Sequence, residues 1–278
     1  MIGRRAFVAS GLALAAMPAW AGTGMKRLVI KGAMEQGSLA LGYAQKGASV
    51  SVDGEKLRLS PGGVFAFGFA YDQSKPSTVA VTWPDGTMET ETYLPTVRRY
   101  EIQRVNGLPQ NTVTPPPEVL ARIKTEAAAI YEARQRDTDG SDFLNGFDWP
   151  APGIESGVFG SQRIDNGVPM APHFGVDMAA PTGTPIHAPA DGTVSLSADH
   201  YLNGGFTLID HGQGVSTSYL HQSKRLVREG ETVKRGQLIG HIGKTGRATG
   251  PHLHWAMNWF EVKLDPSRST RKPKPDPL

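Results

Sequence analysis

The sequence predicts a mainly β protein with a small N-terminal β-sandwich-like domain, a linker helix and a C-terminal β domain. Three observations support this prediction. Most of the chain consists of short apolar or alternating segments separated by turn residues, which is typical of strands. A single stretch repeats its apolar residues at helical spacing. A length of 278 residues is enough for about two domains.

Residues 1–21 have the order of features found in an export signal. Arg4 and Arg5 precede an apolar run at 6–16, and Ala19-Trp20-Ala21 has the small-x-small form of a cleavage site. The run is too short to span a bilayer, so we expect no membrane span in the mature chain. The string "RRAFVA" resembles a twin-arginine signal, although Gly3 replaces the usual Ser or Thr. We therefore expect an exported, periplasmic protein, with the twin-arginine route favoured over Sec.

Charge and cysteine content exclude several classes of function. The net charge is +3, and a chain starting at Gly22 would carry +1, from 27 basic and 26 acidic residues. The Pro-rich tail, 267–278, holds a cluster of basic residues: Arg268, Arg271, Lys272 and Lys274. Such a tail is not a basic folded face, so we expect no nucleic-acid partner. Without cysteine there is no disulfide, thiol nucleophile or thiolate zinc site.

Residues 25–105 form the predicted N-terminal β domain. Asp53-Gly54 lies between two alternating segments and predicts a hairpin. Pro84-Asp85-Gly86 predicts a second hairpin in the same way. The apolar run "GGVFAFGFAY" between them could be a central strand. This domain has no histidine and no evident catalytic set, so we expect a structural or binding role.

Residues 115–150 form the predicted linker. Pro117 suits the first turn of a helix that runs from 118 to 134, and Glu118 complements its N-terminus. The expected apolar stripe consists of Leu120, Ile123, Ala127 and Ile130. We expect this stripe to pack on a neighbouring domain. A loop with aromatic residues follows: Phe143, Phe147 and Trp149.

Residues 151–266 contain all eight histidines of the chain, between His173 and His254. Repeated prolines exclude a long helix here, and the segments between the turns are strand-like. In "PHLHW", His252 and His254 share one side of a strand, so both could bind a metal, or one could bind while the other moves protons. In "HFGVD", a strand and its adjoining turn would direct His173 and Asp177 at the same cavity.

This His/Asp set points to metal-assisted hydrolysis. A His-Asp-His set leaves a fourth position for water, as catalytic zinc sites do. Zinc lowers the pKa of such a water to about 7, so that it can act as the nucleophile, and also polarises a carbonyl. The two remaining histidines of the motifs, His221 and His252, are candidates for proton transfer and for holding a developing oxyanion. No helical HExxH pattern is present, so a zincin with a glutamate base is excluded.

Three segments together resemble successive motifs of peptidase family M23, the lysostaphin/LytM-type zinc metalloendopeptidases. They are "GSQRIDNGVPMAPHFGVDMAAPTGTPIHAPADGTV", "IDHGQGVSTSYLH" and "VKRGQLIGHIGKTGRATGPHLHW". The resemblance implies an antiparallel β-sheet fold, one Zn²⁺ per chain bound by His173, Asp177 and His254, and catalytic roles for His221 and His252. It also implies peptidoglycan peptides as substrate. The bond cut and any protein partners cannot be read from the sequence.

The remaining polar residues near the motifs have simpler interpretations. His211 lies in an Asp-His-Gly turn and is expected to be structural. His187, His200 and His241 are expected to be structural or exposed. Arg247 is expected to be solvated, with contact to an acidic peptide stem as the alternative, and Arg163 stays undecided between the same two interpretations.

Two other functions are weighed against hydrolysis. A LytM-type domain can be a non-catalytic regulator of other wall hydrolases, but that class has lost zinc ligands that this chain keeps. "APADGTV" with "VREGETVKRGQLIGHIG" resembles a biotinyl or lipoyl carrier, but no Met-Lys or Asp-Lys pair occupies the hairpin tip. We also expect the N-terminal domain, the linker helix or the aromatic loop to cover part of the groove. A fragment from about residue 150 should then cleave faster than the mature chain.

Overall fold

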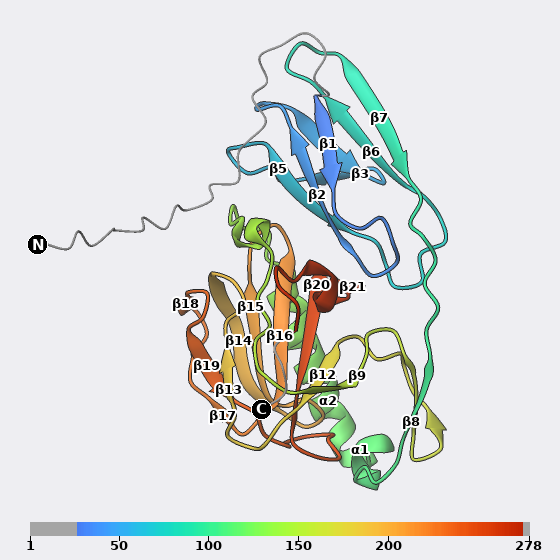
Figure 1. Cartoon of the computed structure of the whole chain (residues 1–278), viewed down its shortest axis with the longest axis vertical. Coiled ribbons are helices and arrows are strands. Elements are labelled where there is room, and N and C mark those ends of the chain that lie inside the picture. The colour runs from blue at the N-terminus through green and yellow to red at the C-terminus, as the bar shows by residue number, and fades with distance from the viewer. Residues whose placement is uncertain (1–26, 275–278) are drawn as a thin grey trace, which may run out of the picture.

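Strands dominate residues 27–274, the part of the chain that this computed structural model describes (Figure 1). A smaller β domain lies at one end of the long axis and a larger β domain at the other. The mainly β fold predicted from the sequence is confirmed. The expected export signal, residues 1–21, lies outside the described residues. No helix within 27–274 is long and apolar enough to cross a membrane.

The N-terminal domain consists of two antiparallel sheets that face each other. One has the order β1-β2-β5, and its strands are Leu28–Lys31, Leu39–Ala44 and Val64–Gly68. The other has the order β4-β3-β6-β7, and its strands are Glu55–Leu57, Ser49–Val52, Ser77–Thr82 and Met88–Tyr93. Both predicted hairpins are present, since β3 pairs with β4 and β6 with β7. The apolar faces of the two sheets form one core around Phe65, Phe67 and Val81.

Strand β5 is not the central strand that its apolar run suggested. It ends the order β1-β2-β5, yet every one of its residues is buried. The reason is that the face of β5 opposite Phe65 and Phe67 packs on the C-terminal domain: Ala66 joins the core of that domain, and the Val64 carbonyl accepts a hydrogen bond from Gln213 Nε2 at 3.1 Å. Arg98 adds an ion pair to buried Asp265 at 2.9 Å. These contacts hold the two domains together.

The linker contains more structure than was predicted. Strand β8 (Ile102–Val105), which the expected first domain included, instead pairs in parallel with β10 (Gln162–Asp165) of the C-terminal domain. A short helix α1 (Gln110–Val113) follows it, and helix α2 (Pro117–Arg134) begins with Pro117 at its first turn, as predicted. A 3-10 turn η1 spans Asp142–Asn145.

Helix α2 packs against β14 (Gly192–His200) and β15 (Gly204–Asp210), but not through the whole stripe predicted from its apolar residues. Ile123 and Ile130 are half-buried, whereas Leu120 is 51% exposed and Ala127 is also exposed. The contact face instead includes Glu126, which accepts a hydrogen bond from the Tyr201 backbone at 2.9 Å. A polar contact of this kind cannot be recognised from apolar spacing alone.

The C-terminal domain is built on one large antiparallel sheet with the order β18-β14-β15-β16-β20-β12-β9, and β21 pairs with β20. In the same order, the strands are Thr232–Val233, Gly192–His200, Gly204–Asp210, Val215–Gln222, His252–Trp259, Val176–Ala179 and Ile154–Gly157, with β21 at Val262–Leu264. Two smaller sheets flank it: β13-β19-β17 (Pro185–His187, Leu238–His241, Lys224–Arg225) and β11-β10-β8 (Val168–Pro169, Gln162–Asp165, Ile102–Val105). A 3-10 turn η2 at Pro266–Ser269 ends the domain.

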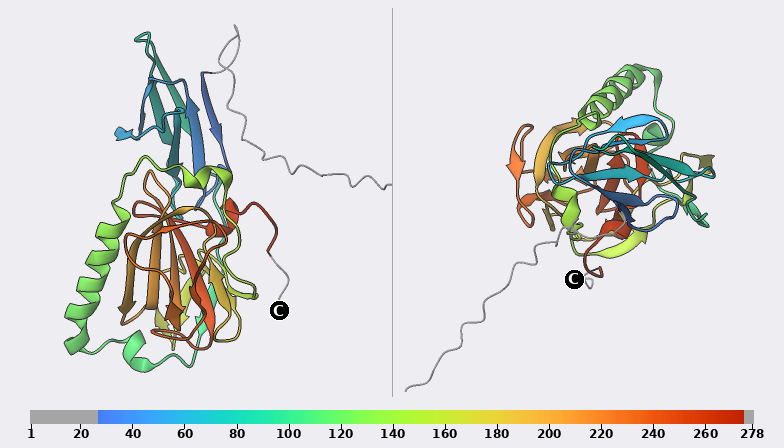
Figure 2. Two further views of the ribbon diagram at one scale, coloured as in Figure 1. Left: turned by 90° about the vertical axis from the view of Figure 1, so that its left-hand side faces the viewer. Right: turned by 90° about the horizontal axis from the view of Figure 1, so that it is seen from above.

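The two faces of this sheet have different surroundings. Along β20, Leu253, Trp255 and Met257 point into the main core, where the aromatic residues of 143–147 also pack. Since alternate residues of a strand face opposite sides, His252 and His254 lie on the other face. Helix α2 covers that second face (Figure 2). The aromatic loop therefore lies behind the sheet and does not cover the face that carries these histidines.

Candidate metal centre

The sheet register brings Asp177 directly opposite His254. Strand β12 runs antiparallel to β20, and Asp177 and His254 are Cα partners in this ladder. His173 lies in the turn before β12, where its backbone N–H bonds to the Ser161 carbonyl at 2.8 Å and its own carbonyl accepts from Gly160 N at 2.7 Å. The strand-plus-turn arrangement thus directs three side chains at one point.

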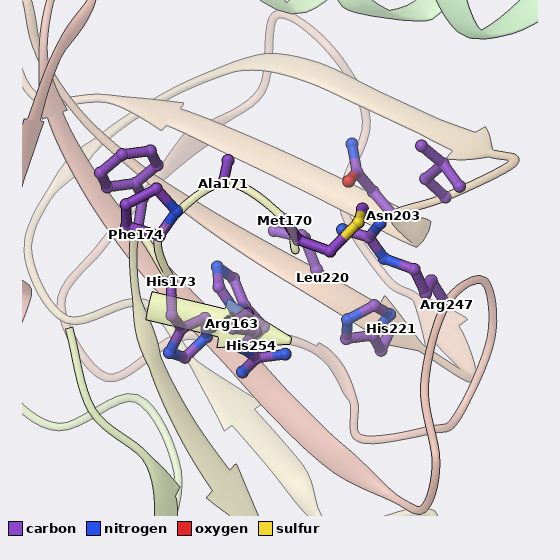
Figure 3. A pocket seen from close by; sticks show the side chains of 12 residues that line it. Arg163, Met170, Ala171, His173, Phe174, Asn203, Leu220, His221, Arg247 and His254 are labelled. Atoms are coloured by element: carbon purple, nitrogen blue, oxygen red, sulfur yellow. Dashed lines mark hydrogen bonds between the residues drawn. The ribbon is translucent and has the colours of Figure 1, made fainter. Parts of the chain in front are cut away.

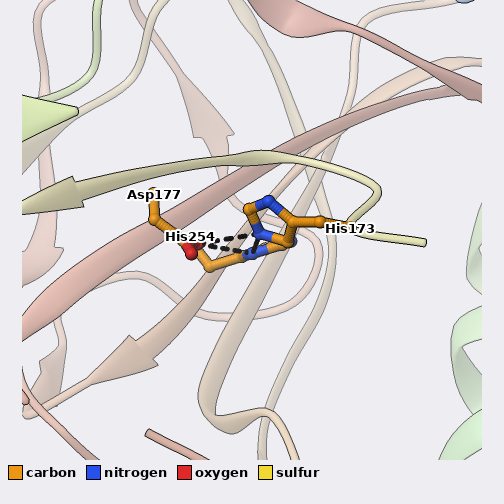
Figure 4. Close-up of side chains that lie close together, drawn as sticks. All are labelled: His173, Asp177 and His254. Carbon is orange, nitrogen blue, oxygen red and sulfur yellow. Dashed lines mark hydrogen bonds and ion pairs between the residues drawn. The ribbon is translucent and has the colours of Figure 1, made fainter. Parts of the chain in front are cut away.

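The donor atoms of these three side chains meet in a tight triangle (Figure 4). His173 Nε2 lies 3.0 Å from Asp177 Oδ1 and 2.9 Å from His254 Nδ1, and the distance between His254 Nδ1 and Asp177 Oδ1 is also 2.9 Å. A ring nitrogen carries at most one proton and can direct that proton at only one neighbour. Hydrogen bonds alone therefore cannot account for all three short contacts among these atoms. Three lone pairs that converge in this way fit a single cation.

A backbone contact sets the orientation of the His173 ring. His173 Nδ1 lies 3.1 Å from the Val158 carbonyl oxygen, which can only accept a hydrogen bond. Nδ1 therefore carries the proton, and the lone pair of Nε2 faces the triangle. Metal-binding histidines in proteins usually donate their other ring N–H to a carbonyl or carboxylate in this way. Sequence reasoning could not find it because the partner is a main-chain atom 15 residues away.

Two glycines leave the space that these ligands occupy. A Cβ at Gly157 on β9 would overlap with the carboxylate of Asp177 and approach the ring of His173. A Cβ at Gly175 would lie 2.5 Å from His254 Nε2 and 2.7 Å from the Trp255 carbonyl oxygen. Gly175 is part of the "HFGVD" motif, and the structure explains why no larger residue fits there.

The ionisation states of the ligands suit metal binding. Burial disfavours a charge on Asp177, but the charge and hydrogen bonds of His173 and His254 outweigh it and hold the pKa of Asp177 well below its usual value. Burial lowers the pKa of His254 to about 4. An ionised carboxylate and a neutral imidazole are the forms that bind a divalent cation.

His221 and His252 lie beside the triangle. Their ring centroids are 4.7 Å apart, and the centroid of His221 is 6.3 Å from that of His254. His221 Nδ1 bonds to the Thr245 carbonyl at 2.8 Å and His252 Nδ1 to the Gly250 carbonyl at 2.9 Å. In each ring Nδ1 therefore donates to a backbone carbonyl, and Nε2 makes no hydrogen bond to another residue within 27–274.

His221 has two further properties of a residue held for function. Its φ of 64° lies in the left-handed region, which a residue with a side chain adopts only when its surroundings require it. Burial, followed by the neighbouring His252 and His254, lowers the pKa of His221 to about 3. The imidazole is therefore neutral at physiological pH and able to accept a proton.

Arg163 is a further component of the site that the sequence left undecided. It lies on β10, and its guanidinium forms an ion pair with Asp177 Oδ2, the carboxylate oxygen that does not belong to the triangle. An arginine here fixes the orientation of the carboxylate and helps keep it ionised. No sequence pattern indicates this contact, because Arg163 and Asp177 come together only through the packing of β10.

The other histidines lie outside the triangle. His211 is fully buried, and its ring bonds to the Asp191 carbonyl at 2.6 Å and to Thr217 Oγ1 at 2.8 Å. His200 stacks on Phe206. His187 and His241 belong to the small sheet β13-β19-β17 and line none of the cavities at the site.

Cavities open on three sides of the triangle. The largest, about 260 Å³, contains His173, His221 and His254 in its wall (Figure 3). A second, about 110 Å³, includes Asp177 and His252 together with residues of the β8 segment. A third, about 170 Å³, runs from His254 beneath helix α2. The β8 segment and helix α2 therefore line the site on two sides. The expectation that a fragment from about residue 150 cleaves its substrate faster than the mature chain stays a prediction.

Comparison with known proteins gives consistent matches for the C-terminal domain. Residues 171–266 match the model of peptidase family M23. The peptidoglycan DD-endopeptidase ShyA of Vibrio cholerae is 49% identical over 88 residues, which are 32% of this chain and 20% of that protein. The DD-carboxypeptidase/endopeptidase Mpg of Neisseria meningitidis is 46% identical over 83 residues, 30% of this chain and 19% of that protein.

A similar structure extends the likeness to both domains. A protein from Pseudomonas aeruginosa assigned to peptidase M23 has a TM-score of 0.66 and 29% identity, covering 84% of this chain and 94% of that one. The curated relatives, in contrast, are matched over only about a fifth of their length.

Proposed function

Since residues 171–266 belong to peptidase family M23, we propose that this protein is a zinc-dependent endopeptidase that hydrolyses peptide cross-links of bacterial peptidoglycan. The observation that carries the proposal is the convergence of His173, Asp177 and His254 on one point, with the rings of His221 and His252 beside it. The similarity to proteins named peptidoglycan DD-endopeptidases supports peptidoglycan as the substrate.

His173 Nε2, Asp177 Oδ1 and His254 Nδ1 would hold one Zn²⁺ per chain. The residues fit a metal because one ligand atom of each lies within 4.8 Å of the others, and because His173 and Asp177 are buried. Two nitrogens and one oxygen form a typical ligand set for catalytic zinc. When bound, zinc would supply a water of low pKa as nucleophile and would polarise the scissile carbonyl.

The other residues of the site would move protons and position the peptide. In His221 and His252 the Nδ1 donates to a backbone carbonyl, so the Nε2 of either ring, when neutral, could take a proton from the attacking water and deliver it to the leaving amine. After protonation, the same rings could donate to the developing oxyanion. Arg163 would act through Asp177 by holding its carboxylate in place.

The proposed location follows from the substrate. Peptidoglycan lies outside the cytoplasm, which agrees with the export signal expected at residues 1–21, and we propose a periplasmic protein. Peptidoglycan peptides are the proposed partner, without a role for nucleic acid.

Product identification from purified peptidoglycan tests this function. The mature chain is incubated with the polymer before and after removal of metal by a chelator, and again after addition of zinc, and the released peptides are identified by mass spectrometry. We expect cleavage that stops on chelation and returns with zinc, and no cleavage by the His254→Ala variant. Zinc binding without cleavage of any peptidoglycan would instead favour a regulator of other wall hydrolases.

A further inference from the structure

Arg247 lies on a rigid turn at the mouth of the site. The turn connects β19 to β20, and the Arg247 backbone N–H bonds to the Leu202 carbonyl at 2.8 Å. Two residues earlier, Thr245 Oγ1 accepts from Gly205 N at 2.9 Å and donates to the Gln222 carbonyl at 3.0 Å. These bonds fix the base of the side chain, so its position does not depend on a mobile loop.

The guanidinium of Arg247 is half-buried but has no close partner within residues 27–274. It lines both the cavity that holds His221 and the cavity that holds His252 (Figure 3). No hydrogen bond of its side chain and no ion pair within 4 Å connects it to another described residue. A partly desolvated cation with no counter-ion within 4 Å is costly, and an anion that enters the cavity would lower that cost.

Nearby charges do not neutralise Arg247. Burial lowers its pKa; Asp165 raises it through space, and Arg163 lowers it again. Asp165 is buried, and its Oδ1 has no hydrogen-bond partner. Arg163 is already paired with Asp177. Of the two arginines in the cavity walls, Arg247 is therefore the one whose donors remain available to a ligand.

We propose that Arg247 determines substrate specificity by binding a free carboxylate of the peptide whose amide is cleaved at the metal centre. This inference rests on the proposed function and names the substrate class as acidic peptides. The planar guanidinium matches a carboxylate with two parallel hydrogen bonds, which favours a carboxylate over a neutral amide. The apolar part of the same cavity wall, which includes Met170, Ala171 and Leu220, suits a small aliphatic residue beside that carboxylate.

A matched pair of cross-linked peptides tests the proposal. The two peptides differ only in whether the carboxyl group next to the scissile bond is free or amidated. We expect the zinc-loaded wild type to have a kcat/KM at least tenfold higher for the free acid. Arg247→Gln should lose most of this preference through a 10- to 100-fold rise in KM for the free acid, and Arg247→Lys should keep part of it. Lys244→Gln is the control, because Lys244 is exposed and lines none of the three cavities.

Three results would overturn the proposal. Equal cleavage of the two peptides by the wild type would show that no carboxylate is recognised. If Arg247→Gln lowered kcat equally for both peptides, Arg247 would instead act at the carbonyl of the scissile bond. The same kinetic change in Asp165→Asn would show that Arg247 acts structurally through that carboxylate.

Binding without turnover separates this inference from the proposed function. The two peptides are titrated into the zinc-loaded His252→Ala variant, with and without Arg247→Gln. A tenfold tighter Kd for the free acid that disappears with Arg247→Gln supports the inference even if the wild type cleaves neither peptide. Equal Kd values overturn the inference even if the wild type is an active endopeptidase.

Discussion

Replacing Gly175 by alanine should disable the metal centre without unfolding the protein. The new Cβ would lie 2.5 Å from His254 Nε2 and 2.7 Å from both His254 Cε1 and the Trp255 carbonyl oxygen. Non-bonded carbon atoms pack at roughly 3.5–4.0 Å, so about 1 Å of movement is needed. The carbonyl of Trp255 belongs to β20 and cannot move easily, so the backbone at residue 175 must move away from β20 and the ring of His254 must shift as well. A displacement of about 1 Å at a catalytic centre costs on the order of 100-fold in rate.

Gly250→Ala is the matched control for this change. Gly250 is two residues before His252, has no positive φ, and a Cβ there would meet nothing within 4 Å. Zinc affinity is measured by competition with a chromogenic chelator, and cleavage by peptide release from peptidoglycan. We expect a loss of about 10- to 100-fold in zinc affinity and a similar or larger loss of activity for Gly175→Ala, and changes below threefold for Gly250→Ala. If both variants matched the wild type in zinc affinity and in peptide release, the backbone at residue 175 would not limit the position of the His254 ring.

Three further predictions concern proton transfer, pH and the N-terminal domain. His221→Ala should keep wild-type zinc affinity but lose roughly 10²- to 10⁴-fold in kcat, because His221 lies beside the ligands without being one; parallel loss of zinc would contradict this role. Burial lowers the pKa of His211 to about 4. Below pH 6.5 this histidine is therefore protonated in the unfolded chain, whereas in the folded chain it stays neutral down to about pH 4. Stability is therefore lost as the pH falls through this window, and by pH 5 the wild type should lose about 2 kcal/mol more than His211→Asn in urea titrations; parallel pH profiles would refute it. Phe67→Ala should lower the free energy of unfolding by about 3–5 kcal/mol, since Phe67 is fully buried between the two N-terminal sheets; a loss below 1 kcal/mol in urea titrations would show that this core is not packed as described.

The hairpins and the helix start were predictable because their causes are local. Asp53-Gly54 and Pro84-Asp85-Gly86 determine their turns by their own backbone preferences, and Pro117 marks the first turn of α2. The edge position of β5 was not predictable, because its burial comes from the C-terminal domain and not from two neighbouring strands. Apolar spacing alone cannot distinguish these two kinds of burial.

The candidate site shows the same division. The motifs "HFGVD" and "PHLHW" predict that His173, Asp177 and His254 approach each other, and the β12–β20 register provides the reason. The contacts that orient them were out of reach, because the Val158 carbonyl is a main-chain atom and Arg163 arrives on a separate strand. The part of the α2 contact face that includes Glu126 was also not predicted, since Glu126 contributes through a hydrogen bond and not through apolar packing.

The position of bound zinc is the most direct test of the central claim. A crystal of the mature chain grown with zinc is measured on both sides of the zinc absorption edge, so that anomalous differences locate the ion. We predict one zinc per chain, at about 2.0–2.2 Å from His173 Nε2, from a carboxylate oxygen of Asp177 and from His254 Nδ1. A zinc ion held by other residues, or no zinc at these three atoms at saturating concentration, would contradict the account.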